Sequence, residues 1–387
     1  MDRRTGLPVV GMVGAGQLAR MTHQAAISLG QSLRVLAAAE DDSAALVCRE
    51  VVVGDYTSYP DLAAFAAGCD VLTFDHEHVP AEHLRGLAAA GHALHPSPDA
   101  LRYAQDKRAM RERLSDLGVP VPHWAPAGAA VDVSAFAEKF GWPVVLKAVR
   151  GGYDGRGVWM LPAADEAGPL LAAGLPLLVE ELVPARRELA VVVARSPYGQ
   201  GAAWPVVETV QQDGICVEVL APAPGLDREV GEQAQRLALT VAGALDVVGV
   251  LAVELFETDQ GLLVNELAMR PHNSGHWTIE GSRTSQFEQH LRAVLDYPLG
   301  LTTMTAPAVA MANVLAAGDP APPDLDERVH HCAARWPAVK LHLYGKQPRP
   351  GRKIGHVTAL GEDPDAIRAA ARAAARCLAG VQPEEPG

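Results

Sequence analysis

The chain has 387 residues, of which 49% are hydrophobic and 20% are charged, and its net charge is −13. This length and composition predict a globular protein with two or three domains. The negative charge disfavours nucleic acid or an anionic membrane surface as the main partner, but it leaves nucleotides open, because local positive groups and metal ions can hold them.

The cysteines and the apolar stretches indicate the cell compartment. The five cysteines are scattered without a Cys-x-x-Cys pair, which predicts reduced thiols in the cytoplasm and no zinc site. No uncharged apolar stretch reaches the roughly 18 residues that span a membrane. The N-terminus passes from Met1-Asp-Arg-Arg directly into an apolar strand, so no signal peptide is expected.

A Rossmann-like unit is expected at the N-terminus. Residues 8–13 form an apolar run typical of a buried parallel strand, and Gly14-Ala-Gly-Gln-Leu18 follows as a tight turn that opens a helix. The turn is an incomplete dinucleotide fingerprint, because Ala19 stands where the third glycine is expected. Another strand, residues 71–74, leads to Glu77. Since α/β sheets place ligands at the carboxyl ends of strands, Glu77 is either a substrate contact or part of a solvated turn.

The middle of the chain carries a glycine-rich loop between two strands. One helix is predicted over residues 98–117 and a second over 131–140, before a strand that delivers Lys147. Glycine lets backbone N–H groups approach phosphate oxygens, and a lysine adds a point charge. The glycines of the loop are Gly151, Gly152, Gly155 and Gly157, and Val158 resumes a strand.

This loop differs from two known phosphate loops. No Lys-Ser or Lys-Thr pair ends it before a helix, and its lysine precedes the glycines, unlike the kinase loop. Tyr153, Asp154 and Arg156 on the loop indicate contact with a second substrate. The alternative is a flexible hairpin tip.

The next strand ends in acceptor groups. The backbone of the stretch Glu180, Glu181, Leu182 and Val183 could recognise adenine through one carbonyl and one N–H group, and Glu188 could accept ribose hydroxyls. The alternative is that the glutamates are surface charges at the end of a strand.

Two strands at 248–256 and 261–267 form a predicted hairpin. It places Glu254, Asn265 and Glu266 on adjacent antiparallel strands, and such oxygen ligands suit Mg²⁺. A pair of surface glutamates is the alternative, but the apolar residues on both sides disfavour it.

Two polar runs follow the hairpin. Arg270-Pro-His-Asn-Ser-Gly-His-Trp277 is rich in hydrogen-bond donors, which predicts an anionic substrate near the metal. Residues 346–353 form a basic cluster that is either a phosphate clamp or a solvated turn. Helices are expected at 229–245, 285–295 and 364–378, and short strands at 188–195, 308–315, 338–343 and 353–357.

Together these motifs resemble the ATP-grasp superfamily and, within it, the family of N5-carboxyaminoimidazole ribonucleotide synthases, which are ATP-dependent carboxylases of purine biosynthesis. The likeness spans nearly the whole chain in the family's order, and the last two motifs are specific to that family. The motifs are Gly14-Ala-Gly-Gln-Leu18, Gly152-Tyr-Asp-Gly-Arg-Gly157, Asn265-Glu266, His272-Asn-Ser-Gly-His-Trp277 and Arg349-Pro-Gly-Arg-Lys-Ile-Gly-His356.

The resemblance implies an α/β and α+β fold with three domains. These are a Rossmann-like (pre-ATP-grasp) domain over residues 1–106, a two-lobed ATP-grasp domain over 107–300, and a small β-rich domain with a terminal helix over 301–387. The implied enzyme is a cytoplasmic homodimer that acts on aminoimidazole ribonucleotide and bicarbonate. ATP would phosphorylate bicarbonate to carboxyphosphate, which carboxylates the ribonucleotide.

The resemblance also implies a role for each site residue. For ATP they are Lys107, Lys147, Gly152, Tyr153, Asp154, Gly155, Arg156, Gly157, Val158, Glu180, Glu181, Leu182, Val183, Glu188, Gln211, Asn265 and Glu266. Glu254 and Glu266 would hold two Mg²⁺, with Mn²⁺ as the alternative metal. For the ribonucleotide they are Glu77, Tyr153, Arg156, Asn273, Ser274, Lys346 and Arg352. The groups that would act in catalysis are Lys147, Tyr153, Asp154, Arg156 and Arg270.

The chain departs from the family pattern at three places. The family often has arginine at Lys107, histidine at Gln211, and Tyr-Glu-x-Glu where this chain has Phe74-Asp-His-Glu77. Three other functions are alternatives for this sequence: a formate-dependent glycinamide ribonucleotide transformylase, a nucleotide-sensing binding protein, and an NAD-dependent dehydrogenase.

Overall fold

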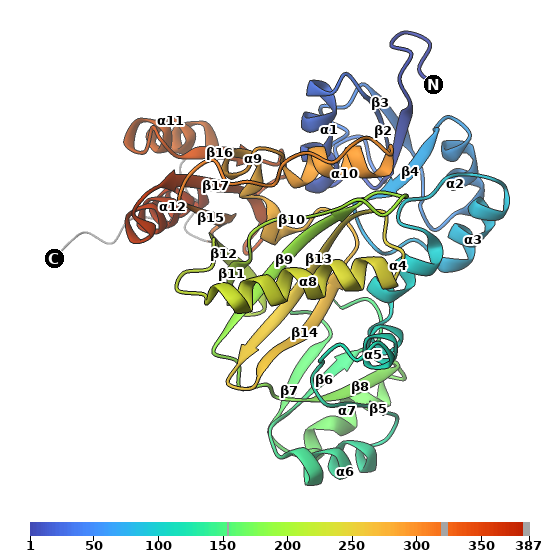
Figure 1. Ribbon diagram of the computed structural model, residues 1–387, viewed down its shortest axis with the longest axis vertical. Helices are drawn as coiled ribbons and strands as arrows, with labels where there is room; N and C mark the ends of the chain where they lie inside the picture. The colour runs from blue at the N-terminus through green and yellow to red at the C-terminus, as the bar shows by residue number, and fades with distance from the viewer. Residues whose placement is uncertain (153–154, 319–323, 382–387) are drawn as a thin grey trace.

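The N-terminal apolar runs form the parallel sheet that their sequence predicts. The structure is a computed structural model that describes residues 1–152, 155–318 and 324–381 (Figure 1). Its first sheet has the parallel order β3-β2-β1-β4. The elements are β1 (Val9–Val13), α1 (Gln17–Ser28), β2 (Ser32–Ala37), β3 (Glu50–Val53), α2 (Tyr59–Ala66), β4 (Val71–Phe74) and α3 (Ala81–Ala89). Every residue of β1 is buried, which explains why its residues are apolar without alternation.

The helix predicted over residues 98–117 is two helices. They are α4 (Pro98–Gln105) and α5 (Lys107–Asp116). Asp106 between them has an extended backbone, with φ −135° and ψ 103°, and its side chain accepts a hydrogen bond from the Ala109 N–H at 2.9 Å. The Lys107 N–H donates to the Val149 carbonyl, also at 2.9 Å. The prediction of one helix was wrong because these capping and tertiary hydrogen bonds outweigh the helical pattern.

The small lobe, at the bottom of Figure 1, is built on an antiparallel sheet of order β5-β8-β6-β7. Its elements are β5 (Trp124–Ala127), α6 (Ala130–Phe140), β6 (Val144–Ala148), β7 (Val158–Leu161), η1 (Ala164–Glu166), α7 (Ala167–Ala172) and β8 (Leu177–Glu181). Val133 and Phe136 of α6 pack with Leu146 and Val179 of the sheet in one apolar cluster. The strands predicted on both sides of the glycine-rich loop are confirmed, and Lys147 pairs with Val158 across them.

The large lobe lies on a nine-stranded antiparallel sheet of order β14-β13-β9-β11-β12-β15-β17-β16, with β10 paired to β9. Its first part comprises β9 (Arg187–Arg195), β10 (Gly201–Ala203), β11 (Val207–Gln212), β12 (Ile215–Ala221), α8 (Arg228–Ala244), β13 (Gly249–Thr258), β14 (Gly261–Ala268), η2 (Asn273–Gly275), α9 (Thr278–Gly281) and α10 (Gln286–Val294). Helix α8 crosses one face of the sheet (Figure 1), where its Ala238 and Val241 join a core cluster with Leu251 of β13. The predicted acidic hairpin is β13 and β14.

The C-terminal strands continue this sheet. The elements are β15 (Ala308–Leu315), α11 (Leu325–Arg335), β16 (Lys340–Leu343), β17 (Lys353–Gly361) and α12 (Pro364–Ala379). β15 pairs antiparallel with β12, from Glu218 opposite Ala312 to Ala221 opposite Val309. The predicted C-terminal strands therefore exist, but they extend the large sheet, and helix α11 was not predicted. No helix in the described part of the chain is both long and apolar enough to cross a bilayer.

Candidate active site

A cavity of about 1680 Å³ is lined by residues of all three sheets. Most of the predicted site residues line it: Glu77, Lys107, Lys147, Gly152, Gly155, Arg156, Val158, Glu180, Glu181, Leu182, Val183, Glu188, Gln211, Glu254, Asn265, Glu266, Arg270, Asn273, Lys346 and Arg352. Gly157 and Ser274 are not among the lining residues. Tyr153 and Asp154 lie outside the described residues.

Strand β6 brings Lys147 to the cavity beside two oxygen groups. Its Nζ lies 2.7 Å from Glu180 Oε2 and 3.1 Å from Asn265 Oδ1. Burial favours the neutral form of Glu180, but the Lys147 ammonium and the Arg111 guanidinium outweigh it and lower the pKa of this carboxyl to about 2. Glu180 is 2% exposed. The interpretation of its carboxylate as a surface charge is therefore wrong, and its backbone is the part left for a nucleotide.

Lys107 also reaches the acidic hairpin, from helix α5. It is the first residue of α5, so the helix break at Asp106 fixes where its side chain starts. Its Nζ forms an ion pair with Glu266 Oε1. Two ammonium groups thus face the hairpin, which is the charge arrangement that a polyphosphate requires.

The hairpin register changes at the predicted acidic residues. Glu254 pairs with Glu266, whereas the next residue, Leu255, pairs with Val264. Asn265 is therefore the extra residue of a β-bulge, a feature that re-aims side chains. Regular alternation would send Asn265 and Glu266 to opposite faces of the sheet. With the bulge, both reach lysines in the cavity.

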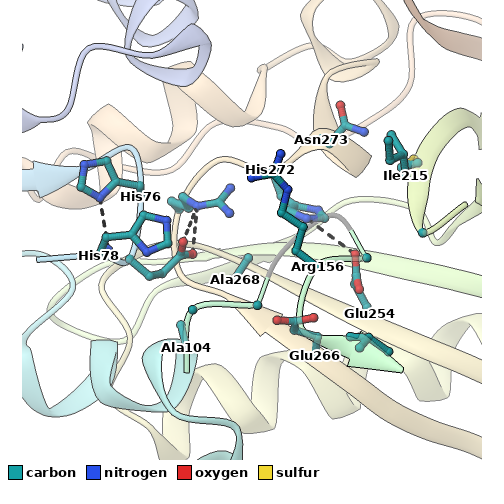
Figure 2. Close-up of a pocket in the computed structure, with 18 of the residues that line it drawn as sticks. His76, His78, Ala104, Arg156, Ile215, Glu254, Glu266, Ala268, His272 and Asn273 are labelled. Carbon is teal, nitrogen blue, oxygen red and sulfur yellow. Dashed lines mark hydrogen bonds and ion pairs between the residues drawn. The ribbon is translucent and has the colours of Figure 1, made fainter. Parts of the chain in front are cut away.

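Carboxylates are crowded at this hairpin. Burial, together with the neighbouring carboxylates of Glu266 and Glu188, raises the pKa of Glu254 to about 8. His272 Nε2 lies 3.6 Å from Glu254 Oε1, and Figure 2 shows His272 reaching toward it above Glu266. The adjacent oxygen ligands of Glu254 and Glu266 suit an added divalent cation, which would stabilise the ionised form of Glu254.

Three glycines of the glycine-rich loop have positive φ angles, which residues with a side chain adopt only with strain. Gly151, Gly155 and Gly157 have φ values of 78°, 75° and 70°. A Cβ added to Gly155 would lie 3.1 Å from the Asp213 carbonyl oxygen, so this part of the loop lies against the turn between β11 and β12. Arg156 projects into the pocket (Figure 2). The contact with another strand pair argues against a free hairpin tip.

Apolar side chains that sequence reasoning missed lie at the predicted nucleotide end. Met160 is 61% exposed and Leu182 is 41% exposed, and both line the cavity together with Phe256. Exposed apolar and aromatic surface of this kind suits the faces of a flat base. The alternation of β7, which exposes Val158 and Met160 on one face, is the signal that could have revealed Met160.

The other predicted nucleotide contacts already have partners. Glu181 accepts a hydrogen bond from the His123 N–H at 2.8 Å, so its side chain is held at the rim. Burial raises the pKa of Glu188, and a hydrogen bond from Gln211 opposes that shift. Gln211 therefore acts on the proposed ribose acceptor at the position where the family often has histidine.

The far end of the cavity contains Glu77 and Arg270. Arg270 Nε donates to Glu77 at 2.9 Å, and the Glu77 side chain is 15% exposed, so it is not part of a solvated turn. Asp75 turns the other way and accepts a hydrogen bond from the Gly16 N–H at 2.6 Å. A Cβ on Gly14 would collide with the Asp75 carboxylate. The protein's own carboxylate therefore occupies the N-terminus of α1, where a Rossmann dinucleotide phosphate would bind.

The donor-rich run places His272 and Asn273 in the cavity but not Ser274. Burial, with help from Arg270, lowers the pKa of His272 to about 3, so its ring is neutral. Ser274 is 1% exposed and its Oγ lies 2.9 Å from His272 Nδ1. In this structure the Ser274 side chain supports His272, and its contact with the ribonucleotide stays a prediction. His272 belongs to the motif but was not predicted as a contact.

Buried histidines tie this loop to the C-terminal strands. The rings of His342 and His356 stack at 4.4 Å between centroids with an interplanar angle of 11°, and His276 lies 5.0 Å from His356. Tyr344 Oη lies 2.7 Å from His356 Nδ1. The contact between His276 and His356 joins the loop to β17, which begins at the basic run. This contact accounts for a histidine in each of the two family-specific motifs.

That basic run borders the same cavity. Lys346 donates to Gln17 Oε1, which links it to the first residue of α1. Lys346, Arg349 and Arg352 all line the cavity. The run therefore belongs to the cavity wall rather than to a remote solvated turn.

The fold and this cavity define an ATP-grasp enzyme. Its marks are a Rossmann-like sheet, two lobes with a glycine-rich loop between strands, two lysines and an acidic hairpin. The ATP-grasp domain family matches residues 112–287. The ribonucleotide synthetase preATP-grasp domain family matches residues 7–105, and the phosphoribosylaminoimidazole carboxylase C-terminal domain family matches residues 309–370. The domain boundaries at 106 and 300 stay predictions.

Similar proteins identify the family. The N5-carboxyaminoimidazole ribonucleotide synthase of Mycobacterium tuberculosis is 61% identical over 361 residues, which cover 92% of this chain and 84% of the relative. That of Corynebacterium ammoniagenes is 52% identical, with coverage of 96% and 92%. The crystal structure of the synthetase from Thermus thermophilus is 38% identical, covers 97% of this chain and 100% of its own, and has a TM-score of 0.86.

A further crystal structure holds ligands. The synthase from Aspergillus clavatus, in complex with ADP and 5-aminoimidazole ribonucleotide, is 31% identical, covers 96% of this chain and 98% of its own, and has a TM-score of 0.87. The chain belongs to the N5-carboxyaminoimidazole ribonucleotide synthase family, and it is an ATP-grasp carbon–nitrogen ligase of purine biosynthesis. The match of the C-terminal part disfavours the transformylase alternative.

Proposed function

We propose that this chain uses ATP and bicarbonate to carboxylate 5-aminoimidazole ribonucleotide on its exocyclic amine, with ADP and phosphate as the other products. One observation carries the proposal. A single cavity is lined by the two lysines, the acidic hairpin and the Glu77–Arg270 pair. The similarity to the Aspergillus clavatus enzyme, which binds ADP and the ribonucleotide, supports the same ligands here.

ATP is proposed to lie between the two lobes. Lys107 and Lys147 would meet its phosphates, and the backbone of residues 152–158 would cover them. The base would lie against Met160 and Phe256, next to the backbone of residues 180–183. Glu188, bonded to Gln211, would accept the ribose hydroxyls.

The hairpin is proposed to hold Mg²⁺. Glu254 and Glu266 are register neighbours, and the raised pKa of Glu254 marks a place where a cation would stabilise the ionised form. Asn265 would bind beside them, and Mn²⁺ could replace Mg²⁺ with the same oxygen ligands. The metal would neutralise phosphate charge as it develops.

The ribonucleotide and bicarbonate are proposed to bind at the other end. Glu77 and Asn273, with Tyr153 and Arg156 of the loop, would contact the ribonucleotide, and Lys346 and Arg352 would bind its phosphate. Arg270 and the neutral His272, which line the same cavity, would donate hydrogen bonds to bicarbonate.

The proposed reaction has two steps. A bicarbonate oxygen attacks the γ-phosphorus of ATP, the bond to the β–γ bridging oxygen breaks, and carboxyphosphate and ADP form. The amine nitrogen then bonds to the carbon of carboxyphosphate, or to CO₂ released from it, while phosphate departs and the nitrogen loses a proton. Lys147 would stabilise the transferring charge, and Arg156 and Asp154 would couple loop closure to substrate binding, since water would destroy the intermediate.

The remaining parts of the proposal rest on the family. The enzyme is proposed to act as a cytoplasmic homodimer. The described cysteines are all free thiols, which suits a reducing compartment.

The test is ADP release by purified enzyme with aminoimidazole ribonucleotide, ATP and Mg²⁺. Turnover is expected to depend on added bicarbonate in CO₂-depleted buffer and not on formate. Turnover with glycinamide ribonucleotide and formate, without a response to bicarbonate, would overturn the proposal. Glu266→Ala is expected to abolish ADP release, whereas Glu232→Ala, on the exposed face of α8, serves as the matched control.

A further inference from the structure

Arg111 is a fully buried arginine that no sequence motif singled out. It lies on α5 with 0% exposure of its side chain. Its Nε donates to Glu180 Oε1 at 2.6 Å, and its Nη1 donates to the Val264 carbonyl at 3.2 Å. Buried charges are costly unless they are paired, so a buried arginine at this place calls for an explanation.

The carboxylate that Arg111 contacts is shared with Lys147. Arg111 binds one oxygen of Glu180, and Lys147 binds the other at 2.7 Å. With Lys147 as an ammonium, the three charges sum to one positive charge at the cavity wall, which Lys147 and Glu180 line. If Arg111 were absent, Glu180 and Lys147 would form a neutral pair. The Glu180 carboxylate would then attract the Lys147 ammonium more strongly, and the ammonium would bind an added anion less well.

Arg111 also joins the two lobes. Glu180 lies in strand β8 of the small lobe, and Val264 lies in β14 of the large sheet, beside the bulge that carries Asn265. Asn265 Oδ1 in turn accepts a hydrogen bond from Lys147. The guanidinium therefore binds one support of the lysine, Glu180, and the residue next to the other, Asn265. Its planar fork suits two acceptors in different directions.

We propose that Arg111 is a positioning residue that acts through Glu180 to keep the Lys147 ammonium available for the phosphates of ATP. The inference rests on the proposed function, in which Lys147 meets those phosphates. Arg111 does not line the cavity, so it has no direct contact with substrate. Its effect should appear in the use of ATP and not in the use of the ribonucleotide.

The test measures steady-state ADP release while ATP and the ribonucleotide are varied separately. Arg111→Met is expected to raise the KM for ATP about tenfold or more, a loss equivalent to one charge-assisted hydrogen bond, and to leave the KM for the ribonucleotide within about twofold. Arg111→Lys keeps one charge beside Glu180 and is expected to restore most of the ATP affinity. An equal rise of both KM values, or none, would overturn the inference.

Double variants separate positioning from simple packing. In Glu180→Gln the carboxylate that Arg111 offsets is absent, so adding Arg111→Met is expected to change the KM for ATP by less than about threefold, a strong departure from additivity. This double variant leaves neither a buried arginine nor a buried carboxylate without its partner, and Lys147 keeps its hydrogen bond to Asn265, so it decides the matter even if Arg111→Met alone does not fold. A further tenfold rise in the KM for ATP over Glu180→Gln would refute the coupling.

Lys147→Met distinguishes the two proposals. If it leaves the KM for ATP unchanged, the placement of ATP under the proposed function fails. If it raises that KM while Arg111→Met does not, the proposed function stands and the inference about Arg111 alone fails.

Discussion

Binding of Mg–ATP should release a proton from Glu254. Burial, together with the carboxylates of Glu266 and Glu188, raises the pKa of Glu254 to about 8. A group with that pKa is about 90% protonated at pH 7. A metal ion bound at this carboxylate would require the ionised form, so about 0.9 proton should leave for each Mg–ATP bound at pH 7.

Isothermal titration calorimetry measures this number when preformed Mg–ATP is titrated in two buffers with different ionisation enthalpies. Glu254→Gln is the matched control, because it keeps the shape and cannot release a proton. The difference in proton release between the two proteins should be close to one at pH 7 and should vanish by pH 9. Equal release by both proteins would refute the reasoning.

The same group links stability to pH without any ligand. Between the model value of 4.5 and about 8, the folded chain keeps a proton that the unfolded chain has lost. The free energy of unfolding should therefore fall as the pH rises through this window. Glu254→Gln should melt at a higher temperature than the parent at pH 8, with a smaller gap at pH 5. A gap independent of pH would show that Glu254 is ionised in the fold.

Four further outcomes are expected. Lys147→Met should raise the KM for ATP roughly 10- to 100-fold, the value of a charge-assisted hydrogen bond, and the KM for the ribonucleotide measured in the same assay should not follow. Asp106→Ala should lower the free energy of unfolding by about 1 kcal/mol in urea titrations through loss of the cap of α5, whereas Asp106→Asn, which can still cap, should lose less. Burial lowers the pKa of His290 to about 3 from 6.5. The contribution of the neutral ring to the free energy of unfolding is therefore complete above pH 6.5 and is lost as the pH falls toward 3. The melting temperature of His290→Gln should depend less on pH in that range than the melting temperature of the parent protein. Gly155→Ala forces a residue with a side chain to φ 75°, and about 1–2 kcal/mol of backbone strain should reduce ADP release at saturating substrates several-fold, while Gly168→Ala, which has open space around it, should not.

Local patterns in the sequence were enough for the strands around the glycine-rich loop and for the acidic hairpin. Lys147, Glu254 and Glu266 lie on short strands with clear apolar flanks, so their neighbourhood follows from the pattern. The bulge at Asn265 does not follow from it, because the register depends on which strand residues pair. The sequence predicted the right residues but not the reason that consecutive side chains share a face.

Contacts between distant segments account for what the sequence could not predict. The break at Asp106 depends on Val149, and the buried state of Glu180 depends on Arg111, which is 69 residues away in the chain. Arginine and glutamate usually lie on protein surfaces, so nothing in the local sequence indicates that this pair is buried. The same holds for Ser274, whose burial behind His272 is decided by packing in the folded loop.

The hydrogen bonds between β12 and β15 bear on how the protein can be divided. Family matches split the chain into three segments, yet the last two share one sheet. A protein truncated before β15 would expose the backbone donors and acceptors of β12 along a bare edge, and such edges recruit strands from other molecules. Fragments or chimeras that end near residue 300 should therefore aggregate. A truncated or chimeric protein that folds would have to keep residues 187–381 together in one polypeptide.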